Sequence, residues 1–268
     1  KKTIGILNIE MIVSEDNKNQ FENLGYIKIS NFIKDKDYKL LCNQLNIEIN
    51  KKFQENSENI MQMGGSLIGN VNIRLGQKGH LIWDYLKKNK IENVISYLTG
   101  IEKDKFESFA GGNLLFPYPK SHNQIFHTDG KKKPRKIILS LCLNEVNKNN
   151  GPTELYEKSH KEEIPYWLFF FKYFFKKKYQ LSLSVGDIFI REAFIWHRGT
   201  KNNSKDPRIL VNFIISENKN KDLNYNINRE ISFFDNMFSS DFRGKVKEFI
   251  DVKLRPIYFF YKFLRSLF

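Results

Sequence analysis

A succession of short strand-like segments, with no helices of the βαβ kind between them, is the strongest constraint on how this chain folds. The segments have the apolar or alternating pattern of β-strands and lie at 106–116, 124–127, 136–144, 153–156, 187–194, 196–199 and 208–216. Turn-forming clusters of proline, asparagine and glycine separate several of them. Because parallel sheets need crossover helices, the pattern predicts an antiparallel sandwich or barrel.

The residues before this region predict helices and one short strand. Residues 21–33 read as a helix end, a stop at Gly25 and a strand in which polar and apolar side chains alternate. Asp35 opens a second helix, and a third spans 80–98 before Gly100. We expect these helices to cover one face of the sandwich.

The chain shows neither an internal repeat nor an interdomain linker, so we expect a single domain. Residues 56–79 are polar and glycine-rich and predict a loop that contains at most one short element, whereas 241–268 predict a helix that Pro256 breaks or kinks. The expected parts are a helical N-terminal support at 1–105, a core at 106–216 and a C-terminal extension at 217–268.

The chain is strongly basic. Its formal net charge is +14, from 44 lysines and arginines against 30 aspartates and glutamates. Such an excess favours anionic partners, such as nucleic acid, acidic lipid head groups or phosphorylated substrates. The abundance of Lys, Asn, Ile, Phe and Tyr is also typical of AT-rich genomes, so charge alone does not decide between function and genome bias.

Cysteine usage and hydropathy favour a cytoplasmic protein. Cys42 and Cys142 lie far apart in apolar surroundings and form no CxxC motif, which predicts buried, reduced thiols. No apolar run reaches the roughly 18 residues needed to span a bilayer. Residues 1–14 lack the small-residue cleavage site of a signal peptide.

Three residues have the types and spacing of a metal site. His127 and Asp129 form an H-x-D pair, and on a strand the side chains of residues i and i+2 point to the same face. His197 ends an apolar run and can come from a strand that is adjacent in space. Two imidazoles and one carboxylate are the ligand set of facial-triad Fe(II) oxygenases, which leave three coordination positions open.

Arg208 adds a fourth element to this pattern. It follows His197 by 11 residues (208 − 197) and opens the next strand-like segment. A guanidinium group can clamp a carboxylate through two parallel hydrogen bonds. Any one of these residues is more often structural than catalytic, but all four in this order predict an iron site that uses 2-oxoglutarate.

Several motifs, in order along 21–216, resemble the phytanoyl-CoA dioxygenase-like (PhyH) family of Fe(II)/2-oxoglutarate-dependent oxygenases. They are the segments 21–33, 126–129, 150–155 with 158–160, 186–190, 196–199 and 207–208. The resemblance implies a mainly β fold with flanking helices, the double-stranded β-helix or cupin-like jelly roll.

The resemblance also implies cofactors, an activity and roles for four residues. The implied cofactors are Fe(II), the co-substrate 2-oxoglutarate and O₂, with His127, Asp129 and His197 on the metal and Arg208 on the co-substrate carboxylate. The implied activity is hydroxylation of an organic substrate, coupled to conversion of 2-oxoglutarate to succinate and CO₂. Desaturation, cyclisation and epimerisation remain open as alternatives to hydroxylation.

Two departures from the family pattern and one agreement bear on the chemistry. The family often has Ser or Thr two residues after the distal histidine, where this chain has Gly199, and we expect Thr200 to substitute in binding the co-substrate. Glu157 and Lys158 replace the usual Pro-Gly of a structural turn. Asp129 is intact, whereas related halogenases replace the metal carboxylate with Gly or Ala.

Two aromatic, lysine-containing segments, 165–179 and 255–268, do not belong to these motifs. They favour peripheral contact with the inner membrane surface and a small, carrier-linked or lipid-linked substrate. A helical flap that packs its aromatic residues on the sandwich, or a dimer interface, explains them about equally well. The sequence leaves the oligomeric state open.

Two other functions compete with the oxygenase. One is a catalytically silent jelly-roll binding module, for example for a saccharide, in which the metal-type residues are incidental. The other is a nucleic-acid demethylase of the same superfamily, which the basic charge suggests. That branch has a further arginine beyond the co-substrate arginine, and only Arg208 fits here, so we expect no nucleic-acid partner.

Overall fold

The computed structural model of the chain describes most of residues 13–234. The described residues are 13–55, 69–103, 107–117, 121–217, 230–234, 242–243, 246, 260–261 and 264–265. Most of the helix predicted at 241–268 and most of the loop predicted at 56–79 therefore fall outside the described residues.

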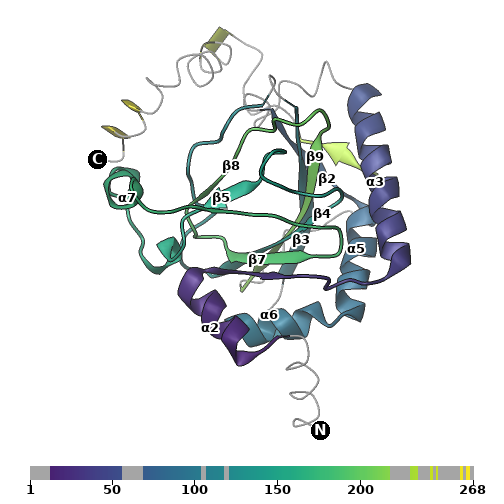
Figure 1. Ribbon diagram of the computed structural model, residues 1–268, viewed down its shortest axis with the longest axis horizontal. Helices are drawn as coiled ribbons and strands as arrows, with labels where there is room; N and C mark the ends of the chain where they lie inside the picture. The colour runs from purple at the N-terminus through teal and green to yellow at the C-terminus, as the bar shows by residue number, and fades with distance from the viewer. Residues whose placement is uncertain are drawn as a thin grey trace.

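Two antiparallel sheets face each other and form the jelly roll (Figure 1). The larger sheet has the order β1 (Tyr26–Ile29), β7 (Ile188–Glu192), β4 (Lys136–Cys142), β9 (Arg208–Ser216), β3 (Glu107–Leu115), β2 (Asn70–Arg74) and β10 (Ser232–Phe233). The smaller sheet has the order β6 (Tyr179–Gln180), β5 (Thr153–Leu155) and β8 (His197–Gly199). The predicted antiparallel, mainly β architecture with flanking helices is confirmed.

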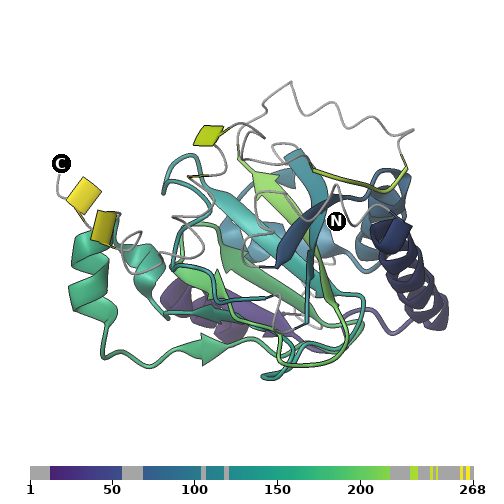
Figure 2. The same ribbon diagram turned by 90° about the horizontal axis from the view of Figure 1, so that it is seen from above.

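Helices cover the outer face of the larger sheet, as expected (Figures 1 and 2). They are α2 (Glu15–Leu24), α3 (Lys36–Glu55), α5 (Gln77–Lys88) and α6 (Ile91–Thr99). Their buried side chains and those of the sheet form one continuous apolar core. Helix α7 (Tyr166–Tyr173) lies on the other side of the molecule, beside the smaller sheet.

Alternation along the central strands separates this core from a polar interior between the sheets. On β9, Ile209, Val211 and Phe213 pack into the core with the helices, while Leu210 and Asn212 line the space between the sheets. Strand β4 alternates in the same way. Because the side chains of a strand alternate with a period of two, polar side chains at every second position reach the interior without disturbing the core.

The structure differs from the predicted elements at three places. The predicted helix at 80–98 is two helices, because Lys90 has a left-handed φ of 61° that an α-helix cannot continue. Strand β2 lies inside the stretch assigned to a loop. Residues 124–127 form no continuous strand and instead meet β8 at a bridge between His127 and His197 and at a hydrogen bond of 2.8 Å from Gln124 N to Gly199 O.

Asp187, in the turn before β7, links this turn to strand β1 and the residues that follow it. Its carboxylate accepts hydrogen bonds of 2.9 Å from the backbone N–H groups of Asn31 and Ser184, and Lys28 Nζ lies 3.0 Å away. Burial alone would raise the pKa of Asp187, but these hydrogen bonds and the ammonium group outweigh it and lower the pKa.

The cysteines have the state predicted for them, because Cys42 and Cys142 are buried and free. Burial raises the pKa of both thiols, to about 11 for Cys42 and about 12 for Cys142. Within the described residues, no helix has the length and apolar character required to cross a bilayer.

Candidate active site

Backbone pairing brings the two predicted histidine ligands face to face. His127 N donates to His197 O at 2.9 Å, and His197 N donates to His127 O at 3.0 Å. In such an antiparallel pair, opposite residues project to the same side. The two imidazole rings consequently lie with their centroids 4.4 Å apart, although the sequence separates them by 70 residues (197 − 127).

Both imidazoles are held with Nε2 as the nitrogen that faces the site. His127 Nδ1 lies 2.7 Å from the carbonyl oxygen of Ile125, and His197 Nδ1 lies 3.0 Å from that of Ile195. Because a carbonyl oxygen only accepts, each Nδ1 carries the proton and each Nε2 presents a lone pair. This is the tautomer that a metal-binding histidine requires.

Asp129 supplies a carboxylate between the two Nε2 atoms. Its Oδ1 lies 3.6 Å from His127 Nε2 and its Oδ2 lies 3.2 Å from His197 Nε2. One donor atom from each of the three residues falls within 4.8 Å of the others. Ligand bonds of about 2.1 Å at right angles would put adjacent donors about 3 Å apart, so the donor set fits a divalent metal in a facial arrangement.

The ionisation states of these groups also suit a metal. Burial, followed by the influence of the neighbouring His197, lowers the pKa of His127 to about 4, so its imidazole is neutral at pH 7. Burial would raise the pKa of Asp129, but the neighbouring His197 and Arg191 outweigh it and hold the pKa well below its usual range. Metal binding at neutral pH would therefore displace no proton from either residue.

Arg191 is the unexpected member of the site. It lies on β7 and is 7% exposed, and its Nη2 is 2.5 Å from Asp129 Oδ2 and 3.2 Å from His197 Nε2. One guanidinium nitrogen therefore contacts two of the three metal-type residues. The positive charge of Arg191 neutralises the carboxylate of Asp129, and it opposes the binding of a divalent metal ion by the same residues.

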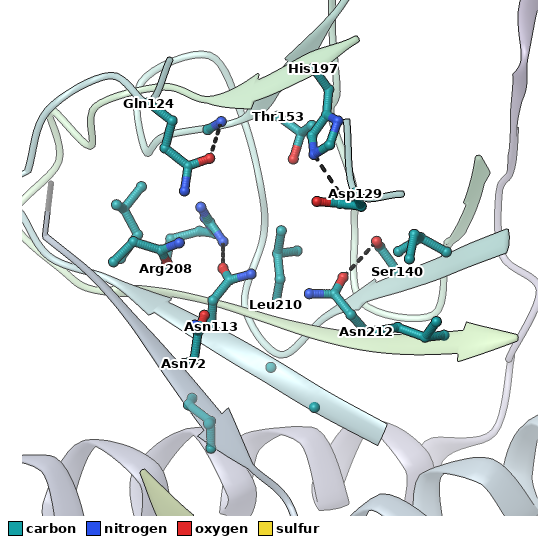
Figure 3. Close-up of a pocket in the computed structure, with 18 of the residues that line it drawn as sticks. Asn72, Asn113, Gln124, Asp129, Ser140, Thr153, His197, Arg208, Leu210 and Asn212 are labelled. Atoms are coloured by element: carbon teal, nitrogen blue, oxygen red, sulfur yellow. Dashed lines mark hydrogen bonds and ion pairs between the residues drawn. The ribbon is translucent and has the colours of Figure 1, made fainter. Parts of the chain in front are cut away.

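Arg208 lies at the opposite end of the same pocket (Figure 3). Its Nε donates to the carbonyl oxygen of Gly151 at 3.2 Å and its Nη1 donates to Asn113 Oδ1 at 2.5 Å. The side chain is 3% exposed, and burial lowers its pKa to about 10, which leaves it charged at pH 7. No carboxylate of the described residues forms an ion pair with Arg208. Its positive charge is therefore buried without a counterion, which favours the binding of an anionic ligand.

The pocket between these two ends has a volume of about 520 Å³, and residues of both sheets line it. Its wall is rich in side-chain amides, contributed by Asn70, Asn72, Asn113, Gln124 and Asn212. In three of the amides the oxygen is already used, because Asn113 accepts from Arg208, Gln124 from Gly199 N and Asn212 from Ser140. Their N–H₂ groups are left as donors, which suits an acceptor-rich ligand.

The structure does not bring Thr200, the predicted co-substrate residue, to this pocket. Its hydroxyl donates to the carbonyl oxygen of Pro152 at 2.7 Å, and it is not among the residues that line the cavity. Gln124 takes the space beside Gly199, whose N–H donates to Gln124 Oε1 at 2.7 Å. A Cβ at Gly199 would come 3.0 Å from that oxygen, so the glycine provides the room that Gln124 occupies.

Sequence reasoning therefore found His127, Asp129, His197 and Arg208, which the structure gathers around one pocket, and missed Gln124 and Arg191. Arg191 had a detectable signal, because it and Glu192 are charged residues in the middle of a mostly apolar strand segment. Gln124 had none, since a single glutamine at the start of a predicted strand belongs to no motif.

Comparisons with known proteins agree with this geometry. The family model for phytanoyl-CoA dioxygenase (PhyH) matches residues 21–210. A search of curated proteins found no significant match.

Solved structures show the same fold at low sequence identity. AviO1 from Streptomyces viridochromogenes Tue57 is 13% identical, with a TM-score of 0.60 over 76% of this chain and 95% of its own. EctD from S. alaskensis, solved with bound Fe, is 14% identical, with a TM-score of 0.59 over 76% of each chain. The epimerase SnoN, solved with Fe³⁺, alpha ketoglutarate and nogalamycin RO, is 14% identical, with a TM-score of 0.57 over 78% and 84%.

Proposed function

We propose, from the premise that this chain belongs to the phytanoyl-CoA dioxygenase family, that it is an Fe(II)- and 2-oxoglutarate-dependent oxygenase that hydroxylates its substrate. The observation that carries the proposal is the buried guanidinium of Arg208, which faces a His–Asp–His donor set across one pocket. A dicarboxylic keto acid is a ligand that could reach both ends, with one carboxylate on Arg208 and the keto acid group at the metal.

In this proposal each residue has one task. His127, Asp129 and His197 hold Fe(II), Arg208 binds the distal carboxylate of 2-oxoglutarate, and Gln124 donates an amide N–H to it. Iron bound here would supply the oxidising power, and the co-substrate would leave as succinate and CO₂. We assign no role to Thr200 in binding the co-substrate.

The remaining pocket wall is proposed to orient the substrate and to keep water out. Ser140 Oγ donates to Asn212 Oδ1 at 2.7 Å, which fixes the amide with its N–H₂ group available to a substrate oxygen. Asn72 and Leu210 line the same cavity. We propose that the substrate is a small organic molecule, or one attached to a carrier or lipid, with acceptor groups that match these donors.

We further propose that the chain is one domain and that it works in the cytoplasm. Side chains of the N-terminal helices and of the larger sheet share one apolar core, which supports a single folding unit. The two buried free thiols, Cys42 and Cys142, suit a reducing compartment.

A metal-free jelly-roll binding module is the second candidate, and the position of Arg191 is the observation that favours it. A guanidinium that bridges Asp129 and His197 satisfies the carboxylate without any metal. If this contact is permanent, the donor set is structural and the amide-lined pocket binds an acceptor-rich ligand, for example a saccharide.

Anaerobic titration of the full chain with Fe(II) and 2-oxoglutarate tests the proposal. A keto acid that chelates facial-triad Fe(II) gives a visible metal-to-ligand charge-transfer band, and we expect this band in the native chain. His197→Ala should abolish it, because one of the three protein ligands is lost. Arg208→Ala should keep the band but raise the 2-oxoglutarate concentration for half-saturation about ten- to a hundredfold, the value of a hydrogen-bonded charge pair.

Lys131→Ala is the charge-matched control, because Lys131 is exposed and does not line the pocket. It should leave the half-saturation concentration unchanged. No band in the native chain would favour the binding module, whereas equal half-saturation for the native chain and Arg208→Ala would remove the assigned role of Arg208. Succinate formation in air, with addition of one oxygen atom to a candidate substrate, tests hydroxylation itself.

A further inference from the structure

Helix α7 packs through one face against an aromatic cluster that includes Trp196, the residue before His197. Phe169 and Tyr173 are buried, and the Phe169 ring stacks on Trp196 with centroids 3.9 Å apart and an interplanar angle of 11°. Trp196 precedes His197 in the chain, and Phe126, which precedes His127, also contacts Phe169. A single layer of aromatic side chains therefore connects α7 to both histidines.

The other face of α7 and the turn after it expose four phenylalanines. The exposed fractions are 45% for Phe170, 65% for Phe171, 56% for Phe174 and 93% for Phe175. Their rings touch one another, with centroids 5.2 Å apart for Phe170 and Phe174 and 4.8 Å for Phe174 and Phe175. Single exposed apolar residues are ordinary, but a contiguous cluster of large ones marks a contact surface.

Lysines border this cluster, and among those that the structure describes here only Lys172 pairs with an acidic residue, Glu162. Lys172, Lys176 and Lys177 are exposed, and Lys178 is half-buried beside the rings of Phe126 and Tyr156. Residues 164–180 contain these four lysines and neither Asp nor Glu. We name Phe170, Phe171, Phe174, Phe175, Lys176 and Lys177 the aromatic–lysine patch.

We propose that the aromatic–lysine patch docks the protein on the surface of an anionic phospholipid bilayer. The phenylalanine rings would enter the boundary between head groups and acyl chains, and the lysines would lie at the phosphates. Eight helical residues extend about 12 Å, far less than the roughly 30 Å of a bilayer core, so the contact is peripheral.

Charge decides between a bilayer and a second copy of the chain as the occupant. In a symmetric dimer through this patch, the lysines of both copies would face one another across a desolvated apolar contact, which like charge opposes. An anionic bilayer presents the opposite charge and an apolar interior together.

A second exposed aromatic segment lies on the same side of the molecule. The last described residues, 260–261 and 264–265, lie next to α7 in both views, where they are drawn in yellow (Figures 1 and 2). Among them, Phe260 is 61% exposed, Tyr261 is 54% exposed and Leu264 is 40% exposed. These residues enlarge the apolar surface that a bilayer would meet.

Co-sedimentation of the full chain with vesicles tests the proposal without any assay of activity. We compare vesicles of phosphatidylcholine alone with vesicles of phosphatidylcholine mixed with phosphatidylglycerol, and expect the chain to prefer the anionic mixture. Lys176→Gln with Lys177→Gln should weaken binding to the mixture about thirtyfold, from about 1 kcal/mol for each lysine at a charged surface. Phe171→Ser with Phe175→Ser should abolish most of the binding.

Leu40→Ser with Ile47→Ser is the matched control, because these apolar residues are 56% and 60% exposed on α3, away from the patch. This variant should bind vesicles like the native chain, and all variants should unfold at the same temperature. Absence of binding, equal binding to both vesicle types, or equal loss in the control would overturn the proposal. So would a dimer that the phenylalanine variant dissociates. The Fe(II) titration is independent of these outcomes, so either result leaves the proposed function to its own test.

Discussion

Replacement of Arg191 by methionine should strengthen metal binding. The guanidinium of Arg191 contacts Asp129 Oδ2 at 2.5 Å and His197 Nε2 at 3.2 Å, and both atoms are proposed metal ligands. A metal about 2.1 Å from His197 Nε2 would lie at most about 5 Å from the Nη2 of Arg191. Methionine keeps most of the length and apolar contacts of the arginine stem but removes the charge.

Two opposing effects decide the magnitude. Charges of +1 and +2 about 5 Å apart repel by roughly 6–7 kcal/mol at an effective dielectric constant of about 20. Rotation of the arginine away from the metal reduces this repulsion to a fraction of that value. Loss of an outer hydrogen bond to a metal ligand, here Asp129, costs about ten- to a hundredfold in affinity, or roughly 1.4–2.7 kcal/mol. Even half of the repulsion, about 3 kcal/mol, exceeds this loss, so we expect a gain in affinity of about two- to thirtyfold.

The assay is competition for Co(II) or Zn(II) between the protein and a chromophoric chelator. Arg135→Met is the control, because Arg135 pairs with Glu192, the neighbour of Arg191 on β7, and does not line the pocket. Arg191→Lys should resemble the native chain, because it keeps the charge. Weaker binding in Arg191→Met would refute the reasoning, since it would mean that Arg191 serves the metal by holding Asp129 in place.

Three further predictions concern other parts of the structure. Gly199→Ala should raise the 2-oxoglutarate concentration for half-saturation of the charge-transfer band about tenfold, because its Cβ displaces Gln124 and one hydrogen bond is lost; Thr200→Val should leave it unchanged. Asp187 has a lowered pKa, so it stabilises the fold above its unfolded-state pKa of about 4, and this contribution is lost as pH falls below that value. Urea unfolding between pH 2 and 6 should accordingly show a shallower acid loss in Asp187→Asn, and a slope equal to the native one would contradict the assignment. Phe169→Ala should lower the free energy of unfolding by about 3 kcal/mol through loss of its stack on Trp196, measured by urea unfolding, and a loss below about 1 kcal/mol would show that α7 contributes little to the fold.

The elements that sequence reasoning found are those in which local pattern and tertiary environment agree. Strand β9 alternates apolar core residues with pocket residues along its length, and its predicted bounds, 208–216, match the structure. The short element allowed within 56–79 was not identified as strand β2, because only Val71 and Ile73 mark it and its pairing with β3 is a long-range contact. Residues 124–127 were predicted as a strand because their pattern does not reveal that they meet β8 only through separate backbone hydrogen bonds at Gln124 and His127.

The same limit separates the site residues that were found from those that were missed. His127, Asp129, His197 and Arg208 have side chains whose chemistry points to a metal or an anion wherever the fold places them. Gln124 is defined only by its contact with Gly199, which depends on how the loop before His127 lies against β8. A pattern of single residues does not encode such a contact, because it arises from two segments separated by 75 positions.

The net charge of the pocket predicts how the two proposed ligands affect each other's binding. Without ligands the pocket contains Arg191, Arg208 and one carboxylate, Asp129, so its fixed charge is +1. On the proposed function, Fe(II) adds +2 and 2-oxoglutarate adds −2, and the loaded pocket returns to the same charge. Either ligand alone moves the charge away from this value, the metal to +3 and the keto acid to −1. Metal and co-substrate should therefore bind cooperatively, and because linkage is reciprocal, each strengthens the binding of the other by the same factor.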